Sequence, residues 1–197
     1  MKILVTGGAR SGKSTFAERW VMKQAKSAGY VATAQAFDDE MKARINLHRL
    51  QREQSGFAWT THEAPLGLAN LLYELSEQPV ITGEKSASEV ASPIVLVDCL
   101  TLWLSNVLLG AGDGQDTSDS VLAREIEQLI AAIEDFPGTL VMVTNEVGSG
   151  IVPEYPLGRQ YRDWAGLLNR TIASISDQVF LVTAGIPIEL KSREYRL

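Results

Sequence analysis

Short runs of apolar residues alternate along the chain with longer segments of mixed polarity. Several runs are continuous rather than alternating, which is typical of strands that are buried on both faces of a sheet. The predicted strands cover residues 3–6, 30–34, 57–61, 94–97, 139–144 and 179–183. Because the longer segments fall between these runs, the pattern favours alternating strands and helices.

The longer segments carry helical signals. Between residues 120 and 136 the apolar positions recur every three or four residues, and Pro137 and Gly138 end the pattern. The predicted helices cover residues 13–27, 39–54, 66–77, 100–109, 120–136 and 159–176. Together these elements predict an α/β fold in which helices cover both faces of a mostly parallel sheet.

Two polar segments are predicted to be loops. Residues 83–93 are rich in Ser and Glu, and residues 110–119 are rich in Gly and Asp. Neither is long enough to indicate an interdomain linker, and the sequence shows no internal repeat. A chain of 197 residues can bury one sizeable core, so we expect a single domain spanning residues 1–197.

Composition and charge narrow the classes of function. Hydrophobic residues make up 45% of the chain, yet no apolar run approaches the roughly 20 residues of a membrane span. The net charge of −6 argues against a general nucleic-acid surface. The single Cys99 cannot form an internal disulfide, which fits a reducing compartment. We therefore expect a cytoplasmic protein that acts on small molecules, with no nucleic-acid partner and no membrane span.

A phosphate-binding loop follows the first predicted strand and precedes the first predicted helix. Its pattern is G-x-x-x-x-G-K-[ST], formed by Gly7, Gly8, Ala9, Arg10, Ser11, Gly12, Lys13 and Ser14. Glycines let backbone N–H groups approach an anion closely, and the following helix points its positive end at the phosphates. Because strand, loop and helix come in the required order, the segment predicts a nucleoside triphosphate site.

Two side chains are predicted to hold Mg²⁺ beside this loop. The Ser14 hydroxyl belongs to the motif, while Lys13 reaches the β- and γ-phosphates. Asp98 closes the strand predicted at 94–97, where a carboxylate can hold Mg²⁺ through water. The alternative for Asp98 is an ordinary aspartate at a strand end.

The predicted helix at 39–54 offers a possible nucleophile. Arg44, His48 and Arg52 are spaced by four residues, so they lie along one helix face, and Arg49 flanks them. Met41, Ile45, Leu47 and Leu50 can supply packing. Guanidinium groups attract phosphates, and a histidine nitrogen can attack phosphorus to form a covalent intermediate. These residues alone leave open a solvated helix with an incidental histidine.

Other nucleotide-binding classes are less compatible with the sequence. A regulatory GTPase would carry Asn-Lys-x-Asp to read guanine, but the segment Thr144–Val147 lacks the lysine. The residues leave open a kinase of small molecules and a nucleotide-binding module without transfer chemistry. Residues 145–154 follow a predicted strand, and their glycines suit either the mouth of the site or an ordinary connection.

Several motifs in a fixed order resemble one enzyme family. They are Gly7–Ser14, Ala32–Ala34, Asp38–Met41, Arg44-Ile45, His48, Thr144–Gly148, Gly150–Glu154 and Arg162-Asp163 followed by Gly166 and Asn169. From the first predicted strand to about Lys191, the chain resembles the bifunctional adenosylcobinamide kinase/adenosylcobinamide-phosphate guanylyltransferase of cobalamin biosynthesis. The resemblance implies phosphorylation of adenosylcobinamide by a nucleoside triphosphate. A second step then transfers GMP from GTP onto that phosphate, giving adenosylcobinamide-GDP and pyrophosphate.

The resemblance also implies site residues, a fold and an assembly. GMP would pass through a histidine, and the matching position is His48. The nucleotide site, for GTP and ATP with Mg²⁺, would include Ala32, Thr33, Ala34, Arg49, Leu50, Gln51, Arg52, Glu63 and Asp98. Many relatives have a second histidine where Leu47 stands, which leaves His48 as the candidate in this helix; His62 is interpreted as structural or peripheral. The fold would be a three-layer, RecA-like P-loop NTPase and the assembly a homotrimer.

Overall fold

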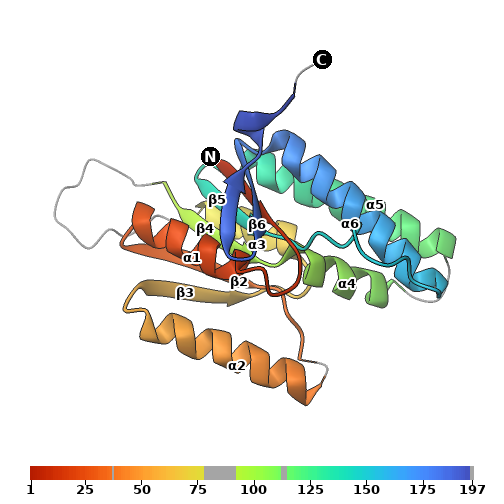
Figure 1. Ribbon diagram of the computed structural model, residues 1–197, viewed down its shortest axis with the longest axis horizontal. Coiled ribbons are helices and arrows are strands. Elements are labelled where there is room, and N and C mark those ends of the chain that lie inside the picture. The colour runs from red at the N-terminus through yellow and green to blue at the C-terminus, as the bar shows by residue number, and fades with distance from the viewer. Residues whose placement is uncertain (37, 78–91, 112–114, 196–197) are drawn as a thin grey trace.

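The computed structural model describes residues 1–36, 38–77, 92–111 and 115–195, without the side chains of residues 44 and 115–117. One seven-stranded sheet runs through this part of the chain, in the order β3-β2-β4-β5-β1-β6-β7 (Figure 1). The strands are β1 (Lys2–Thr6), β2 (Ser27–Ala32), β3 (Ala58–Glu63), β4 (Ile94–Asp98), β5 (Thr139–Val143), β6 (Gln178–Thr183) and β7 (Ile186–Glu189). All neighbouring pairs are parallel except β6 and β7.

Helices cover both faces of this sheet. The described helices are α1 (Lys13–Gln24), α2 (Asp39–Gln54), α3 (Leu68–Glu77), α4 (Leu100–Gly110), α5 (Gln115–Asp135) and α6 (Pro156–Ile175), with a 3₁₀ turn η1 (Lys191–Arg193) after β7. Residues of α3 to α6 share one hydrophobic core with one sheet face, and residues of α1 share a second core with the other face. The predicted three-layer α/β architecture with a mostly parallel sheet is confirmed.

The strand order places the phosphate loop at the centre of the sheet. β1 lies between β5 and β6, and β5 separates it from β4. Ile3, Leu4 and Val5 of β1 have at most 1% exposure, as expected for a parallel strand with helices on both sides. The loop after β1 and Asp98 at the end of β4 therefore emerge at the same edge of the sheet, one strand apart.

The structure corrects several predicted boundaries. Helix α1 begins at Lys13 as predicted but ends at Gln24, earlier than predicted, and β2 runs from Ser27 to Ala32 instead of 30–34. Ser, Ala and Gly have low strand propensity, and pairing with β3 and β4 overrides it. Helix α5 begins at Gln115, which contradicts the loop predicted at 110–119; acidic residues suit a helix start. Most of the loop predicted at 83–93 lies outside the described residues.

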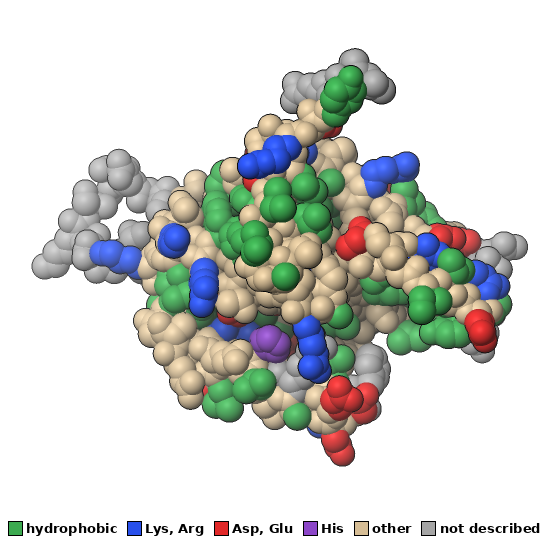
Figure 2. Space-filling view, viewed as in Figure 1, with side chains coloured by type: hydrophobic (Ala, Val, Ile, Leu, Met, Phe, Trp, Pro, Cys, Tyr) green, Lys and Arg blue, Asp and Glu red, His purple; other side chains and the backbone are tan. Residues whose placement is uncertain are grey.

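Strand β7 is absent from the predicted elements. It pairs antiparallel with β6 after a two-residue turn at Ala184 and Gly185, which both have positive φ. Pro187 makes the segment look unlike a strand in the sequence, because proline cannot donate a backbone hydrogen bond. Proline is nevertheless tolerated in an edge strand such as β7. Figure 2 shows hydrophobic side chains gathered over β6 and β7, where Ile186 and Ile188 are 64% and 42% exposed.

Helix α2 lies at the margin of the molecule, beyond β3 in Figure 1. Leu47 and Leu50 are 55% and 52% exposed, so the expectation that they supply packing is wrong. A narrow stripe of the helix faces inward instead, which leaves these leucines on the solvent side. Among the described residues, no helix is both long enough and apolar enough to cross a membrane.

Candidate active site

The phosphate loop is held from two sides by backbone hydrogen bonds. The Glu146 N–H donates to the Gly7 carbonyl at 3.1 Å, and the Gly185 N–H donates to the Ser11 carbonyl at 2.9 Å. Gly7 has φ +154°, and a Cβ there would lie 2.4 Å from the Val182 carbonyl oxygen. A glycine is therefore required at Gly7 by both conformation and space. The loop is thus anchored to the core at its start, at Gly7, while Gly8, Ala9, Arg10 and Gly12 are exposed.

The start of α1 is suited to an anion. Gly12 caps the helix without a side-chain hydrogen bond, and the first turn contains no acidic residue. The positive end of the helix dipole is thus not compensated by a carboxylate of that turn. The buried Ser11 Oγ has no hydrogen-bond partner among the described residues, and Lys13 Nζ donates to the Gly8 carbonyl at 3.0 Å. These features fit a loop that closes around phosphate oxygens.

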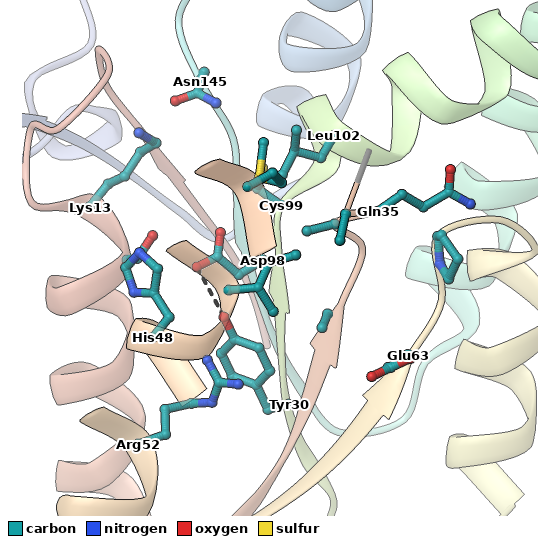
Figure 3. Close-up of a pocket in the computed structure, with 17 residues that line it drawn as sticks. Lys13, Tyr30, Gln35, His48, Arg52, Glu63, Asp98, Cys99, Leu102 and Asn145 are labelled. Carbon is teal, nitrogen blue, oxygen red and sulfur yellow. Dashed lines mark hydrogen bonds between the residues drawn. The ribbon is translucent and has the colours of Figure 1, made fainter. Parts of the chain in front are cut away.

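A cavity of about 440 Å³ opens beside this loop (Figure 3). The predicted site residues that line it are Lys13, Ser14, Ala32, Ala34, His48, Arg52, Glu63 and Asp98. They come from α1, from the ends of β2, β3 and β4, and from α2. The fold therefore brings the loop lysine, the strand-end carboxylate and the histidine to one cavity, although they are far apart in the sequence.

Other predicted site residues lie outside the lining of this cavity. The loop residues Gly7 to Gly12 lie beside it, and the exposed Arg49, Leu50 and Gln51 do not line it. Thr33 is fully buried; its hydroxyl donates to the Cys99 carbonyl at 2.7 Å and accepts from the Cys99 N–H at 2.8 Å. Thr33 thus joins the ends of β2 and β4 through its side chain. His62 is half-buried on β3 and does not line the cavity.

Helix α2 turns one narrow stripe toward the cavity. Its N-terminus is capped by Asp38, whose Oδ1 accepts from the Met41 N–H at 2.7 Å. Met41, Ile45, His48 and Arg52 line the cavity, and their spacing of four, three and four residues places them on one helix face. The side chain of Arg44 lies outside the described structure. His48 therefore faces the cavity together with two apolar side chains and Arg52.

A polar cluster joins α2 to the sheet at the base of the cavity. The guanidinium carbon of Arg52 lies 3.6 Å from the Tyr30 ring centroid, and the Tyr30 hydroxyl donates to Asp98 Oδ2 at 3.2 Å (Figure 3). Burial raises the pKa of Glu18 on α1 to about 7; the negative charge of Asp98 adds to this rise and Arg52 opposes it. Burial and the neighbouring Asp98 also raise the pKa of Tyr30 well above its ordinary value.

The segment after β5 is fixed by side-chain hydrogen bonds from α4 and α6. The Thr144 hydroxyl donates to Asn169 Oδ1 at 2.7 Å, and Asn169 Nδ2 donates to the Asn145 carbonyl at 3.0 Å. Asn145 Nδ2 in turn donates to Thr101 Oγ1 at 2.8 Å, and Asn145 lines the cavity. Arg162 on α6 donates to the Gly148 carbonyl at 2.6 Å. These bonds explain why Asn169 and Arg162 accompany the Thr144–Gly148 motif.

Sequence reasoning did not assign several residues that line the cavity. They are Tyr30, Gln35, Ala36, Met41, Ile45, Pro65, Cys99, Leu102 and Asn145. In the sequence Tyr30 resembles an ordinary buried residue of a strand. The residues around it give no indication that it contacts Arg52, which belongs to another element. Asn145 carries a signal, because it belongs to the Thr144–Gly148 motif.

The cavity contains hard oxygen donors that fit Mg²⁺. Ser14 with its hydroxyl and Asp98 with its carboxylate both line it, together with Lys13. Within the described residues, no group of three or more His, Cys, Asp or Glu side chains could hold a metal ion. This composition fits Mg²⁺, which is commonly bound through one or two protein ligands together with substrate phosphates and water.

Known proteins match this chain over nearly its whole length. A family model described as cobinamide kinase / cobinamide phosphate guanyltransferase matches residues 3–190. The bifunctional adenosylcobalamin biosynthesis protein CobP of Pseudomonas aeruginosa is 41% identical over 191 residues, covering 97% of this chain and 98% of the relative. The bifunctional adenosylcobalamin biosynthesis proteins CobU of Escherichia coli and Salmonella typhimurium are each 38% identical over 198 residues, covering 97% of this chain and 100% of the relative.

Proposed function

The chain belongs to the cobinamide kinase / cobinamide phosphate guanyltransferase family, and we propose that one cavity carries both reactions of that family. The observation that carries the proposal is that His48 lines the same cavity as Lys13, Ser14 and Asp98. The phosphate loop would hold the nucleoside triphosphate in both reactions. The attacking group would decide which phosphorus reacts.

In the kinase reaction, the aminopropanol hydroxyl of adenosylcobinamide would attack the γ-phosphorus. The bond between the γ-phosphorus and the oxygen that bridges to the β-phosphate breaks, the nucleoside diphosphate leaves with that oxygen, and the hydroxyl proton passes to solvent. Lys13 would stabilise negative charge on the β- and γ-phosphate oxygens. Ser14 and Asp98 would hold Mg²⁺, which supplies further charge neutralisation when it is bound.

In the transferase reaction, a ring nitrogen of His48 would attack the α-phosphorus of GTP. The bond to the bridging oxygen breaks and pyrophosphate leaves, which gives a guanylyl-histidine. A phosphate oxygen of adenosylcobinamide phosphate then attacks the same phosphorus, breaks the P–N bond and returns His48 to its starting state. Arg52 lies one turn beyond His48 on the same face, where its charge favours phosphate groups in the cavity.

The sharpest test is covalent labelling with GTP that carries ³²P at the α-position. Wild-type protein with Mg²⁺ is expected to keep label after denaturation, and the label should be labile in acid and stable in base, as for a phosphoramidate. His48→Ala is expected to take no label. His62→Ala is the matched control, because His62 does not line the cavity, and it should label as wild type does. Equal labelling of His48→Ala and wild type would contradict the guanylyl-histidine.

We also propose that the protein is a homotrimer. The family resemblance supports this, and so do the exposed apolar side chains of β7. Ile186 and Ile188 are spaced by two residues on this edge strand, so they project from the same face of it. Exposed apolar groups that cluster on one face suit an interface between protein chains.

A further inference from the structure

We propose that Tyr30 is a positioning residue for the transferase reaction, because its ring holds Arg52 and thereby fixes the helix that carries His48. The inference rests on the proposed role of His48. It concerns a residue that contributes no reacting atom. It follows from the burial pattern of α2 and from the contacts of Tyr30 with Arg52 and Asp98.

The first observation is that α2 has little buried surface of its own. Among the α2 residues whose side chains the structure describes, only Arg52 is buried, with 7% exposure. Met41, Ile45 and His48 are half-buried, and the remaining described side chains are exposed. An amphipathic helix is normally held by a stripe of buried apolar residues, and α2 lacks such a stripe in the described part. Its attachment to the sheet therefore depends strongly on Arg52.

The second observation is how Arg52 is held. Its guanidinium carbon lies 3.6 Å from the centroid of the Tyr30 ring, well within the range of a cation–π interaction. Among the described residues, the ion pairs within 4.0 Å do not include Arg52. Tyr30 itself is 5% exposed, and its ring also packs edge-on against Trp59 with centroids 5.8 Å apart. The ring is thus a fixed platform for the guanidinium group.

The third observation is that Tyr30 connects the two halves of the site. Its hydroxyl donates to Asp98 Oδ2 at 3.2 Å, while its ring holds Arg52 (Figure 3). Arg52 is four residues beyond His48, so both point from the same face of α2. Fixing Arg52 therefore fixes the direction in which His48 faces the loop. Tyr30 sets the position of His48 relative to the phosphate-binding residues.

Two substitutions at Tyr30 separate the ring from the hydroxyl. Tyr30→Phe and Tyr30→Leu both lose the hydrogen bond to Asp98, but only Tyr30→Leu loses the ring under Arg52. We expect Tyr30→Leu to form guanylyl-enzyme about tenfold more slowly than Tyr30→Phe, since a cation–π contact contributes on this scale. Kinase turnover should differ less than about twofold between these two variants, because γ-phosphoryl transfer does not use His48. Equal labelling rates in the two variants would overturn the proposal.

Hydrogen exchange gives a readout that does not depend on the chemistry of His48. In the nucleotide-free protein, α2 amides should exchange about tenfold faster in Tyr30→Leu than in Tyr30→Phe, whereas α1 amides should exchange equally. If wild type takes no label at His48, the proposed function fails, and the exchange comparison still decides whether Tyr30 fixes α2. Equal α2 exchange in both variants would show that it does not.

Arg52→Met tests the same contact from the other side and leaves the core residue Tyr30 in place. It should speed α2 exchange as Tyr30→Leu does. Combining it with Tyr30→Leu should add little further effect, because both changes remove one interaction. Fully additive effects in the double variant would mean that the two residues act separately, and would overturn the proposal.

Discussion

The two helices that bring charged groups to the cavity, α1 with its phosphate loop and α2, are held in different ways. Helix α1 buries Lys13, Ala17 and Val21, and its loop follows the central strand β1. Helix α2 buries only Arg52 among its described side chains. Under the proposed function, Lys13, the group common to both reactions, is therefore buried with the core, while His48, the group needed for one reaction, lies on a helix with little buried surface.

The largest effect is expected from removing the shared group. Lys13→Ala should lower the rates of kinase turnover and of guanylyl-enzyme formation by about 10³-fold each. Removing one fixed group that stabilises the negative charge developing on the phosphates in the transition state has an effect of this size. Steady-state kinase assays and α-³²P labelling measure the two rates. Lys23→Ala is the matched control, since Lys23 is an exposed lysine at the other end of α1. Kinase turnover in Lys13→Ala at the wild-type rate would contradict the proposal that both reactions use the phosphate loop.

The next effect concerns stability at the phosphate loop. Gly7→Ala is expected to lower the free energy of unfolding by about 2–4 kcal/mol, because it combines unfavourable φ with a steric overlap. Nothing lies within 4 Å of a Cβ at Gly8, so Gly8→Ala should cost less than about 1 kcal/mol. Leu47→Ala on the exposed side of α2 should change stability by less than about 0.5 kcal/mol. Urea unfolding measures all three.

Equal losses in the free energy of unfolding for Gly7→Ala and Leu47→Ala would contradict the contrast between a loop anchored at Gly7 and a helix with little buried surface. A large loss for Gly8→Ala with a small one for Gly7→Ala would instead show that space around the loop differs from that described.

A smaller effect is expected at Glu18 of α1, whose carboxyl is influenced by the charge of Arg52 on α2. Its pKa is raised from 4.5 to about 7 by burial and Asp98, while Arg52 opposes the rise. The folded state therefore favours the neutral carboxyl. Proton binding by Glu18 therefore adds to the free energy of unfolding. This contribution is fully present below about pH 4.5 and is lost as the pH rises through about 7. Glu18→Gln, which mimics the neutral form, should unfold with the same free energy as wild type near pH 4.5.

At pH 8 Glu18 of the wild type is charged, and burial makes this charge unfavourable in the folded state. The Glu18→Gln variant should therefore be about 1–2 kcal/mol more stable than wild type. The difference is no larger because water partly screens the carboxylate. Urea unfolding without Mg²⁺ or nucleotide measures the difference. Glu74→Gln, a change at an exposed position of α3, should show no such dependence on pH. A stability difference at Glu18 that does not vary with pH would rule out this electrostatic origin.

Much of the fold and the phosphate loop could be predicted from the sequence because their signals are local. Continuous apolar runs indicate buried parallel strands, and the eight residues from Gly7 to Ser14 carry their own backbone requirement. Strand β7 was missed because Pro187 weakens the pattern and pairing with β6 overrides it. The exposed positions of Leu47 and Leu50 could not be read from the sequence, because helical spacing does not say which apolar side chains find a partner.

The sequence by itself determined the kind of ligand, through the loop that binds phosphates, and the family, through motifs in a fixed order. Only the tertiary structure decided that His48 shares a cavity with Lys13, Ser14 and Asp98. It also decided that Tyr30, an ordinary strand residue in the sequence, holds Arg52 and Asp98. The physical reason is that these contacts join four elements that lie far apart along the chain, and a sequence pattern describes only neighbours on one element.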